Sequence, residues 1–87
     1  MKLIIAILRD SDSDAVSHGL TSTDLRVTQV ASTGGFLRRG NTTLLIGLED
    51  EQVEGALDII RKNCGPAQEG EKRASIFVVK VDQYIHF

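Results

Sequence analysis

The sequence predicts a small α+β domain in which four strands and two helices follow in the order β-α-β-β-α-β. Three patterns predict this order: a continuous apolar run near the start, helical apolar spacing in the second half, and strand-like segments around a glycine-rich stretch. The 87 residues suffice for one such domain with one modest core, so we expect residues 1–87 to fold as a single domain.

A strand and a helix are expected at the start of the chain. Residues 2–8 form an isoleucine-rich apolar run of strand length, so both faces of this strand should be buried. Residues 9–14 are a cluster of helix N-cap residue types, whose acids favour the positive end of a helix. The helix should run to about Ser22, and Gly19 weakens it by about 1 kcal/mol relative to alanine.

Two further strands are expected on either side of the glycine-rich stretch. Residues 25–30 alternate between apolar and polar types, which places Arg26 and Thr28 on the same face. Residues 42–48 are β-branched and apolar, and this composition is typical of a strand.

A second helix is expected between residue 49 and Gly65. Residues 49–51 are acidic and suit its first turn, whereas Gly65 and Pro66 are typical of a helix end. Apolar side chains recur between them with the spacing of one helix face. These are Val53, Ala56, Leu57 and Ile60.

Together the elements form the ferredoxin-like arrangement, in which two helices cover one face of a four-stranded antiparallel sheet. The first strand is apolar on both sides. The last strand, residues 75–81, presents Ile76 and Val78 one way and Phe77 and Val79 the other. An uncovered apolar sheet face marks an interaction surface, so we expect a homo-oligomer that packs its sheet faces together.

Composition and charge limit the classes of function. The net charge of −2 argues against a general nucleic-acid binder. The apolar start is too short for a membrane span and lacks a signal-peptide cleavage site. The single cysteine, Cys64, has no Cys/His cluster around it, so we expect a structural cysteine, no metal site and a cytoplasmic protein.

The stretch ASTGGFLRRGNTT, residues 31–43, has the glycine spacing of a phosphate-binding loop. A Walker-type loop, however, needs a lysine after its second glycine and a helix beyond it. Here Asn41 follows Gly40, and a strand follows Asn41. A plain turn between strands and another kind of phosphate contact remain as interpretations.

Nearly the whole chain resembles one known family. The start KLIIAI and the run RVTQVASTGGFLRRGNTTLLIGLEDEQVEGALDIIRKNCG are similar to the cyclic-di-AMP receptor family of PII-like signalling proteins. The run STGGFL-x-x-GNTT-x-L-x-G is the most specific part of the similarity. The resemblance implies a PII-like homotrimer that binds cyclic-di-AMP in clefts between subunits.

Carried over by position, the resemblance implies eight ligand-binding residues. Two match residues near the phosphates, three match the loop around an adenine, and three match further contacts. They are Arg26 and Thr28, then Gly35, Phe36 and Leu37, and finally Asn41, Gly47 and Phe77.

The chemistry of these residue types supports the assignments. Arg26 offers a planar fork of N–H donors that suits phosphate oxygens, and Phe36 and Phe77 can stack on bases. Gly35 allows the backbone to approach a ligand closely. The structural alternatives are a solvated strand arginine, a tight glycine connection, and phenylalanines that belong to the core or to an interface.

Three features depart from the family pattern. The segment 66–74 is much shorter than the corresponding loop of typical members. Asp24 stands where the family has asparagine, and its carboxylate repels a phosphate. His86 stands where the family favours glutamine near the end of the chain.

Cyclic-di-AMP or a related adenine nucleotide is therefore the expected partner, without a further cofactor. The alternatives are a PII-like sensor of ATP, ADP or AMP, and a ligand-free trimer that docks an unidentified protein. No residue pair has a recognised catalytic spacing, so we do not expect an enzyme.

Overall fold

The computed structural model describes residues 1–30, 40–66 and 73–87 of the chain. Within these ranges the chain forms four strands, two α-helices and one short 3₁₀ helix. In chain order they are β1 (Lys2–Arg9), α1 (Asp10–Thr21), β2 (Arg26–Val30), β3 (Asn41–Leu48), η1 (Asp50–Gln52), α2 (Val53–Asn63) and β4 (Ala74–Lys80).

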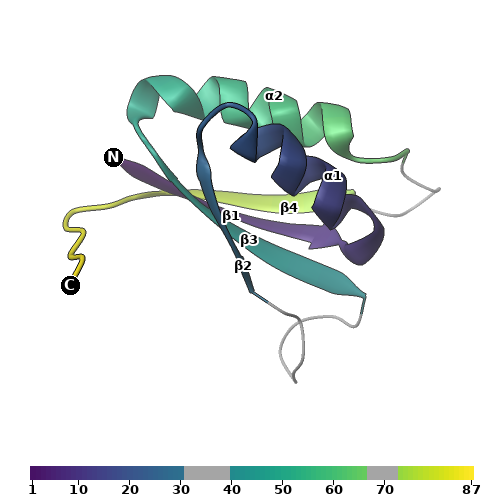
Figure 1. The fold of residues 1–87 in the computed structure, drawn as a ribbon, viewed down its shortest axis with the longest axis horizontal. Helices are drawn as coiled ribbons and strands as arrows, with labels where there is room; N and C mark the ends of the chain where they lie inside the picture. The colour runs from purple at the N-terminus through teal and green to yellow at the C-terminus, as the bar shows by residue number, and fades with distance from the viewer. Residues whose placement is uncertain (31–39, 67–72) are drawn as a thin grey trace.

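The strands form one antiparallel sheet in the order β2-β3-β1-β4. Figure 1 shows both helices on the same face of this sheet. The predicted α+β ferredoxin-like arrangement is therefore confirmed. The boundaries lie within one or two residues of the predicted ones, except that the predicted first turn of the second helix is the 3₁₀ helix η1 and α2 begins only at Val53. Neither described α-helix has the length and apolar character needed to span a bilayer.

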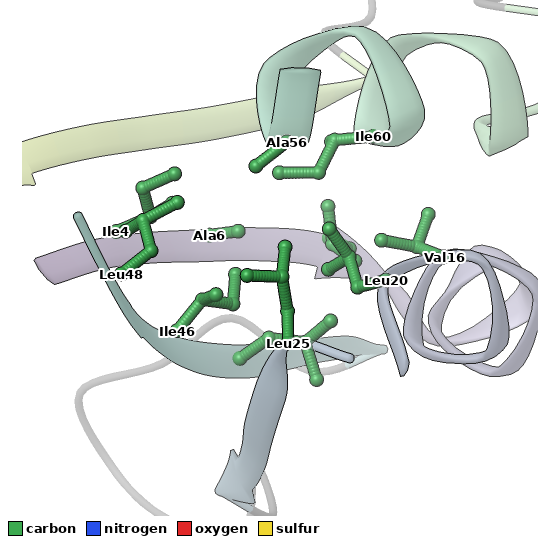
Figure 2. Packing of buried hydrophobic residues seen from close by; sticks show 11 residues of the cluster. Ile4, Ala6, Val16, Leu20, Leu25, Ile46, Leu48, Ala56 and Ile60 are labelled. Atoms are coloured by element: carbon green, nitrogen blue, oxygen red, sulfur yellow. The ribbon is translucent and has the colours of Figure 1, made fainter. Parts of the chain in front are cut away.

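The hydrophobic core lies between the helices and the sheet. Alternate residues of β1 point into it, and Ile4 lies between Ile46 of β3 and Val78 of β4 in the strand register. Figure 2 shows Ala56 and Ile60 of α2 above these strands. The buried cluster consists of Ile4, Ala6, Leu8, Val16, Leu20, Leu25, Leu44, Ile46, Leu48, Ala56 and Ile60, with Val53 and Leu57 packed against it.

The two helices begin differently from each other. The prediction that polar residues cap α1 is wrong, because β1 leads directly into the helix and Arg9 occupies the N-cap without a side-chain cap. Asp10 and Asp12 still lie in the first turn, where the helix dipole favours acids. Before α2, Glu49 and Gln52 form a capping box, and the Glu49 N–H donates to Gln52 Oε1 over 2.8 Å.

A polar cluster ties the start of α1 to the end of α2. Asp12 is buried, and its carboxylate accepts hydrogen bonds from Arg9 Nε at 2.8 Å and from the Gly65 N–H at 3.1 Å. The Arg9 guanidinium also donates to the Gly65 and Pro66 carbonyl oxygens, at 2.7 and 3.1 Å. These bonds satisfy a buried charge that would otherwise destabilise the fold.

The two helices approach each other closely at Gly19. A Cβ atom at this position would lie 2.9 Å from Ile59 Cγ2 and 2.9 Å from Asn63 Nδ2. The Asn63 amide is itself held by a 2.8 Å bond to the Ile59 carbonyl oxygen. Because Gly19 has no side chain, α1 and α2 can pack closely at this point. The stability gained from this packing outweighs the low helix propensity of glycine.

Substitution of Gly19 by alanine should destabilise the protein. Overpacking costs about 1–3 kcal/mol, and alanine returns at most about 1 kcal/mol of helix propensity. The matched control is Gly55→Ala in α2, where an added Cβ meets nothing within 4 Å and should stabilise by about 0.5–1 kcal/mol. Urea denaturation at equal protein concentration measures both, and equal gains in the two variants would contradict the packing role.

Candidate ligand-binding site

With the strand-end pair Asn41 and Arg9 set aside, the face of the sheet opposite the helices contains four of the predicted ligand-binding residues. Since successive strand residues point to opposite faces, the register assigns twelve positions to this helix-free face. They are Arg26, Thr28 and Val30 of β2, Thr43, Leu45 and Gly47 of β3, Leu3, Ile5 and Ile7 of β1, and Ser75, Phe77 and Val79 of β4.

Arg26 and Gly47 lie directly opposite each other on strands β2 and β3. Both are exposed, and a Cβ added at Gly47 would meet only Met1 Cε, at an ordinary contact distance of 3.6 Å. Nothing described within one chain therefore requires glycine at position 47. The bare backbone leaves space beside the Arg26 side chain, which a flat group could enter.

Thr28 and Phe77 share a second row across the same face. The row runs from Thr28 through Leu45 and Ile5 to Phe77, whose side chain is 54% exposed. Three strand spacings of about 4.8 Å separate the ends of this row by about 14 Å. The polar residues of β2 and the aromatic residue of β4 therefore lie at opposite edges of one sheet (Figure 1).

Asn41 is the first residue of β3 and pairs with Arg9 at the end of β1. By alternation it shares a face with Thr43, at the end of β3 where the chain enters from the glycine-rich stretch. The predicted site residues Gly35, Phe36 and Leu37 belong to that stretch and lie outside the described residues.

Thr43 is a polar residue of this face that the sequence analysis missed. It is only 8% exposed, and in the described part of the chain its buried Oγ1 has no hydrogen-bond partner. A buried hydroxyl without a partner is costly, so this group needs a partner beyond the described residues, such as a water, an ion or another molecule. The available signal was a hydroxyl-bearing residue at an otherwise apolar strand position.

The backbone conformation at Asp24 explains which residue types suit this position, and the sequence did not show this conformation. Its φ is +65°, in the left-handed region, and the Asp24 N–H donates to the Thr21 carbonyl oxygen over 3.1 Å. The Leu25 N–H donates to the Leu20 carbonyl oxygen over 3.4 Å, and both leucines are in the core. This is a Schellman motif with Asp24 at the position that usually holds glycine or asparagine.

A cavity of about 310 Å³ lies on the helix side of the sheet and contains none of the predicted site residues. Its lining consists of Leu57, Ile60, Arg61, Cys64, Arg73, Ala74 and Ile76. Burial raises the pKa of the Cys64 thiol, with a further contribution from Asp12. This pKa agrees with the predicted structural role, because a protonated thiol is a weak nucleophile and a weak metal ligand.

The described residues contain no cluster of metal ligands, and the end of the chain contains a stacked aromatic pair. Across the described ranges, no three His, Cys, Asp or Glu side chains gather as a metal site. His86 stacks on Tyr84 with ring centroids 6.3 Å apart, in the exposed tail after β4.

The fold defines the class of protein: a small ferredoxin-like α+β domain whose sheet has one face without helices. A family model described as "Cyclic-di-AMP receptor" matches residues 1–86, so the chain belongs to the cyclic-di-AMP receptor family. A crystal structure described as that of a functionally unknown protein from Pediococcus pentosaceus ATCC 25745 is similar, with a TM-score of 0.78. The two chains are 36% identical, over 99% of this chain and 96% of that chain.

Variants at Asp24 should separate its backbone role from its charge. Asp24→Ala places an ordinary side chain in the left-handed region, which should lower the free energy of unfolding by about 1 kcal/mol. Asp24→Gly also removes the carboxylate but tolerates the positive φ, so it should be at least as stable as the original protein. Urea denaturation compares the two, and equal stability of the alanine and glycine variants would contradict the backbone role.

Proposed function

We propose that this protein is a cyclic-di-AMP receptor, and that it binds its ligand in clefts between the subunits of a PII-like homotrimer. The observation that carries the proposal is the placement of Arg26 and Thr28 on the edge strand β2, with Gly47 beside Arg26 on β3, and of Phe77 on the opposite edge strand β4. The membership of the family supports the identity of the ligand.

The helix-free face supports assembly because most positions on its two inner strands are apolar. Leu3, Ile5, Ile7 and Leu45 occupy its two inner strands, and Phe77 and Val79 are exposed on the edge strand. Covering such a surface removes apolar area from water at about 25 cal/mol per Å². Packing of like faces from several copies is the simplest way for one chain to achieve this.

The two edges of the sheet explain why the ligand would lie between copies. Within one copy, Thr28 and Phe77 lie at opposite ends of a row with two apolar strands between them. If the β2 edge of one copy lies next to the β4 edge of another, these residues face a common cleft. A rotationally closed assembly repeats that cleft at each interface.

The chemistry of the cleft suits a cyclic dinucleotide of adenine. Arg26 can donate two parallel hydrogen bonds to one phosphate, and Thr28 adds a hydroxyl on the same strand face. Phe77 offers a ring for stacking on a base, worth about 1–3 kcal/mol when fully engaged. The bare Gly47 leaves space for the flat ligand beside Arg26.

The oligomeric state tests the assembly with two neighbouring valines. Native mass spectrometry should give three times the chain mass of 9.5 kDa. Val79 and Val78 are similarly exposed in one chain, 41% and 44%, but Val79 is on the helix-free face and Val78 on the helix side. Val79→Asp should therefore yield monomers, whereas Val78→Asp should remain trimeric; a monomeric original protein would refute the assembly.

Titration calorimetry tests the ligand. Cyclic-di-AMP should bind the original protein, and Arg26→Ala should weaken binding about 10- to 100-fold, because a hydrogen bond to a charged group contributes about 1.5–3 kcal/mol. The control is Arg61→Ala, which removes an exposed arginine of α2 paired with Asp58 over 2.9 Å and should leave affinity unchanged. Heat with ATP, ADP or AMP but none with cyclic-di-AMP would establish the alternative nucleotide sensor instead.

A further inference from the structure

The junction between β1 and α1 is hydrogen-bonded to the first residues of β3. The Asp10 N–H donates to the Gly40 carbonyl oxygen over 2.8 Å. The Asp10 carboxylate oxygen Oδ1 accepts a hydrogen bond from Thr42 Oγ1. Asp10 thus holds the residue before Asn41 with its backbone and the residue after Asn41 with its side chain.

These bonds determine which way the start of β3 faces. Thr42 is buried, pairs with Leu8 of β1, and bonds to Asp10 on the helix side. Since neighbouring strand residues point to opposite faces, Asn41 and Thr43 are then directed to the helix-free face. There the Thr43 hydroxyl is buried without a partner among the described residues.

Asp10 adds these two bonds to the strand ladder that pairs Asn41 and Thr42 with Arg9 and Leu8 of β1. Gly40, just before the ladder, has a φ of +88°, and a Cβ built on it would meet nothing within 4 Å. Asp10, by contrast, is anchored in the first turn of α1, where Ser13 Oγ donates to the Asp10 carbonyl oxygen over 3.0 Å. Asp12, two residues on, is fixed by its bonds to Arg9 and Gly65.

The geometry points to Asp10 as a positioning residue of the ligand site. It would not touch the ligand, but would preorganise Asn41 by holding Gly40 and Thr42 on either side. This inference rests on the proposed cyclic-di-AMP binding. It adds Asp10, which bonds to β3 from the helix side, opposite to the face on which Asn41 lies. Preorganised groups bind more tightly because less conformational freedom is lost on binding.

Paired substitutions test the inference by calorimetry with cyclic-di-AMP. Asp10→Ala and Thr42→Val each remove the side-chain bond and should each weaken affinity about tenfold, with the double variant no weaker than either single one. Asp10→Asn and Thr42→Ser retain an acceptor and a hydroxyl respectively, so both should bind within about twofold of the original protein. Additive losses, or equal affinities in all variants, would overturn the positioning role.

A control variant separates positioning from a general loss of stability. Asp12→Ala removes a buried carboxylate of the same junction, whose hydrogen bonds among the described residues go to Arg9 and Gly65 and not to β3. It should lower the free energy of unfolding at least as much as Asp10→Ala, yet leave affinity unchanged at temperatures where the protein is folded. Equal affinity losses in the two variants would show that Asp10 has a structural role only.

Amide hydrogen exchange of the ligand-free protein tests the same role without ligand. Asp10→Ala should accelerate exchange at residues 41–43 several-fold, because their local opening becomes easier, whereas Asp12→Ala should not. If the original protein binds no cyclic-di-AMP but exchange changes as expected, the proposed function fails and the anchoring of β3 by Asp10 stands. If the ligand binds and exchange at residues 41–43 is unaffected, the positioning role fails and the proposed function stands.

Discussion

The central position of β1 is the constraint on which the rest of the molecule depends. This strand pairs with β3 over eight residues and with β4 over seven, and it is apolar on both faces. A slip of one residue in either pairing would turn the core side chains of a strand to the wrong face. The register is therefore strongly specified, and it determines both the core under the helices and the composition of the helix-free face. Helices α1 and α2 cover one face, and no described element covers the other (Figure 1).

Three polar residues at the junction of β1 and α1 connect the register of β1 to the candidate site. They are Arg9, Asp10 and Asp12. Arg9 and Asp12 hold the backbone after α2 at Gly65, while Asp10 holds the entry of β3 at Gly40 and Thr42. Each bond satisfies a polar group at a place where the chain passes from one element to another. The same few residues that end the central strand therefore also fix the geometry at one end of the sheet. The stability of the fold and the placement of Asn41 are linked at this junction.

The glycines and Asp24 show how one residue type can serve different physical needs. Gly19 was interpreted from the sequence as a weak point of a helix, but it lies where α1 and α2 come closest. A Cβ at Gly47 would meet only Met1, at an ordinary distance, and the backbone angle is usual, so nothing in the described part of the chain requires glycine there. Asp24 was interpreted only through its charge, whereas its backbone occupies the left-handed position of a Schellman motif. In each case a local pattern identified the position but not its cause.

The sequence alone determined the elements, their order and the family, because apolar periods of 2 and 3.6 residues and the glycine-rich motif are local properties of the chain. It also placed Arg26 and Thr28 together, since residues two apart on a strand share a face. The ligand-binding roles of all eight predicted residues stay predictions, and Gly35, Phe36 and Leu37 lie outside the described residues. Only the tertiary structure showed that Arg26 lies opposite Gly47 and that Phe77 is at the far edge of the same face. It also showed that the Thr43 hydroxyl is buried without a partner among the described residues. These facts depend on which strands pair and in which register, and that choice is made by packing between residues far apart in sequence.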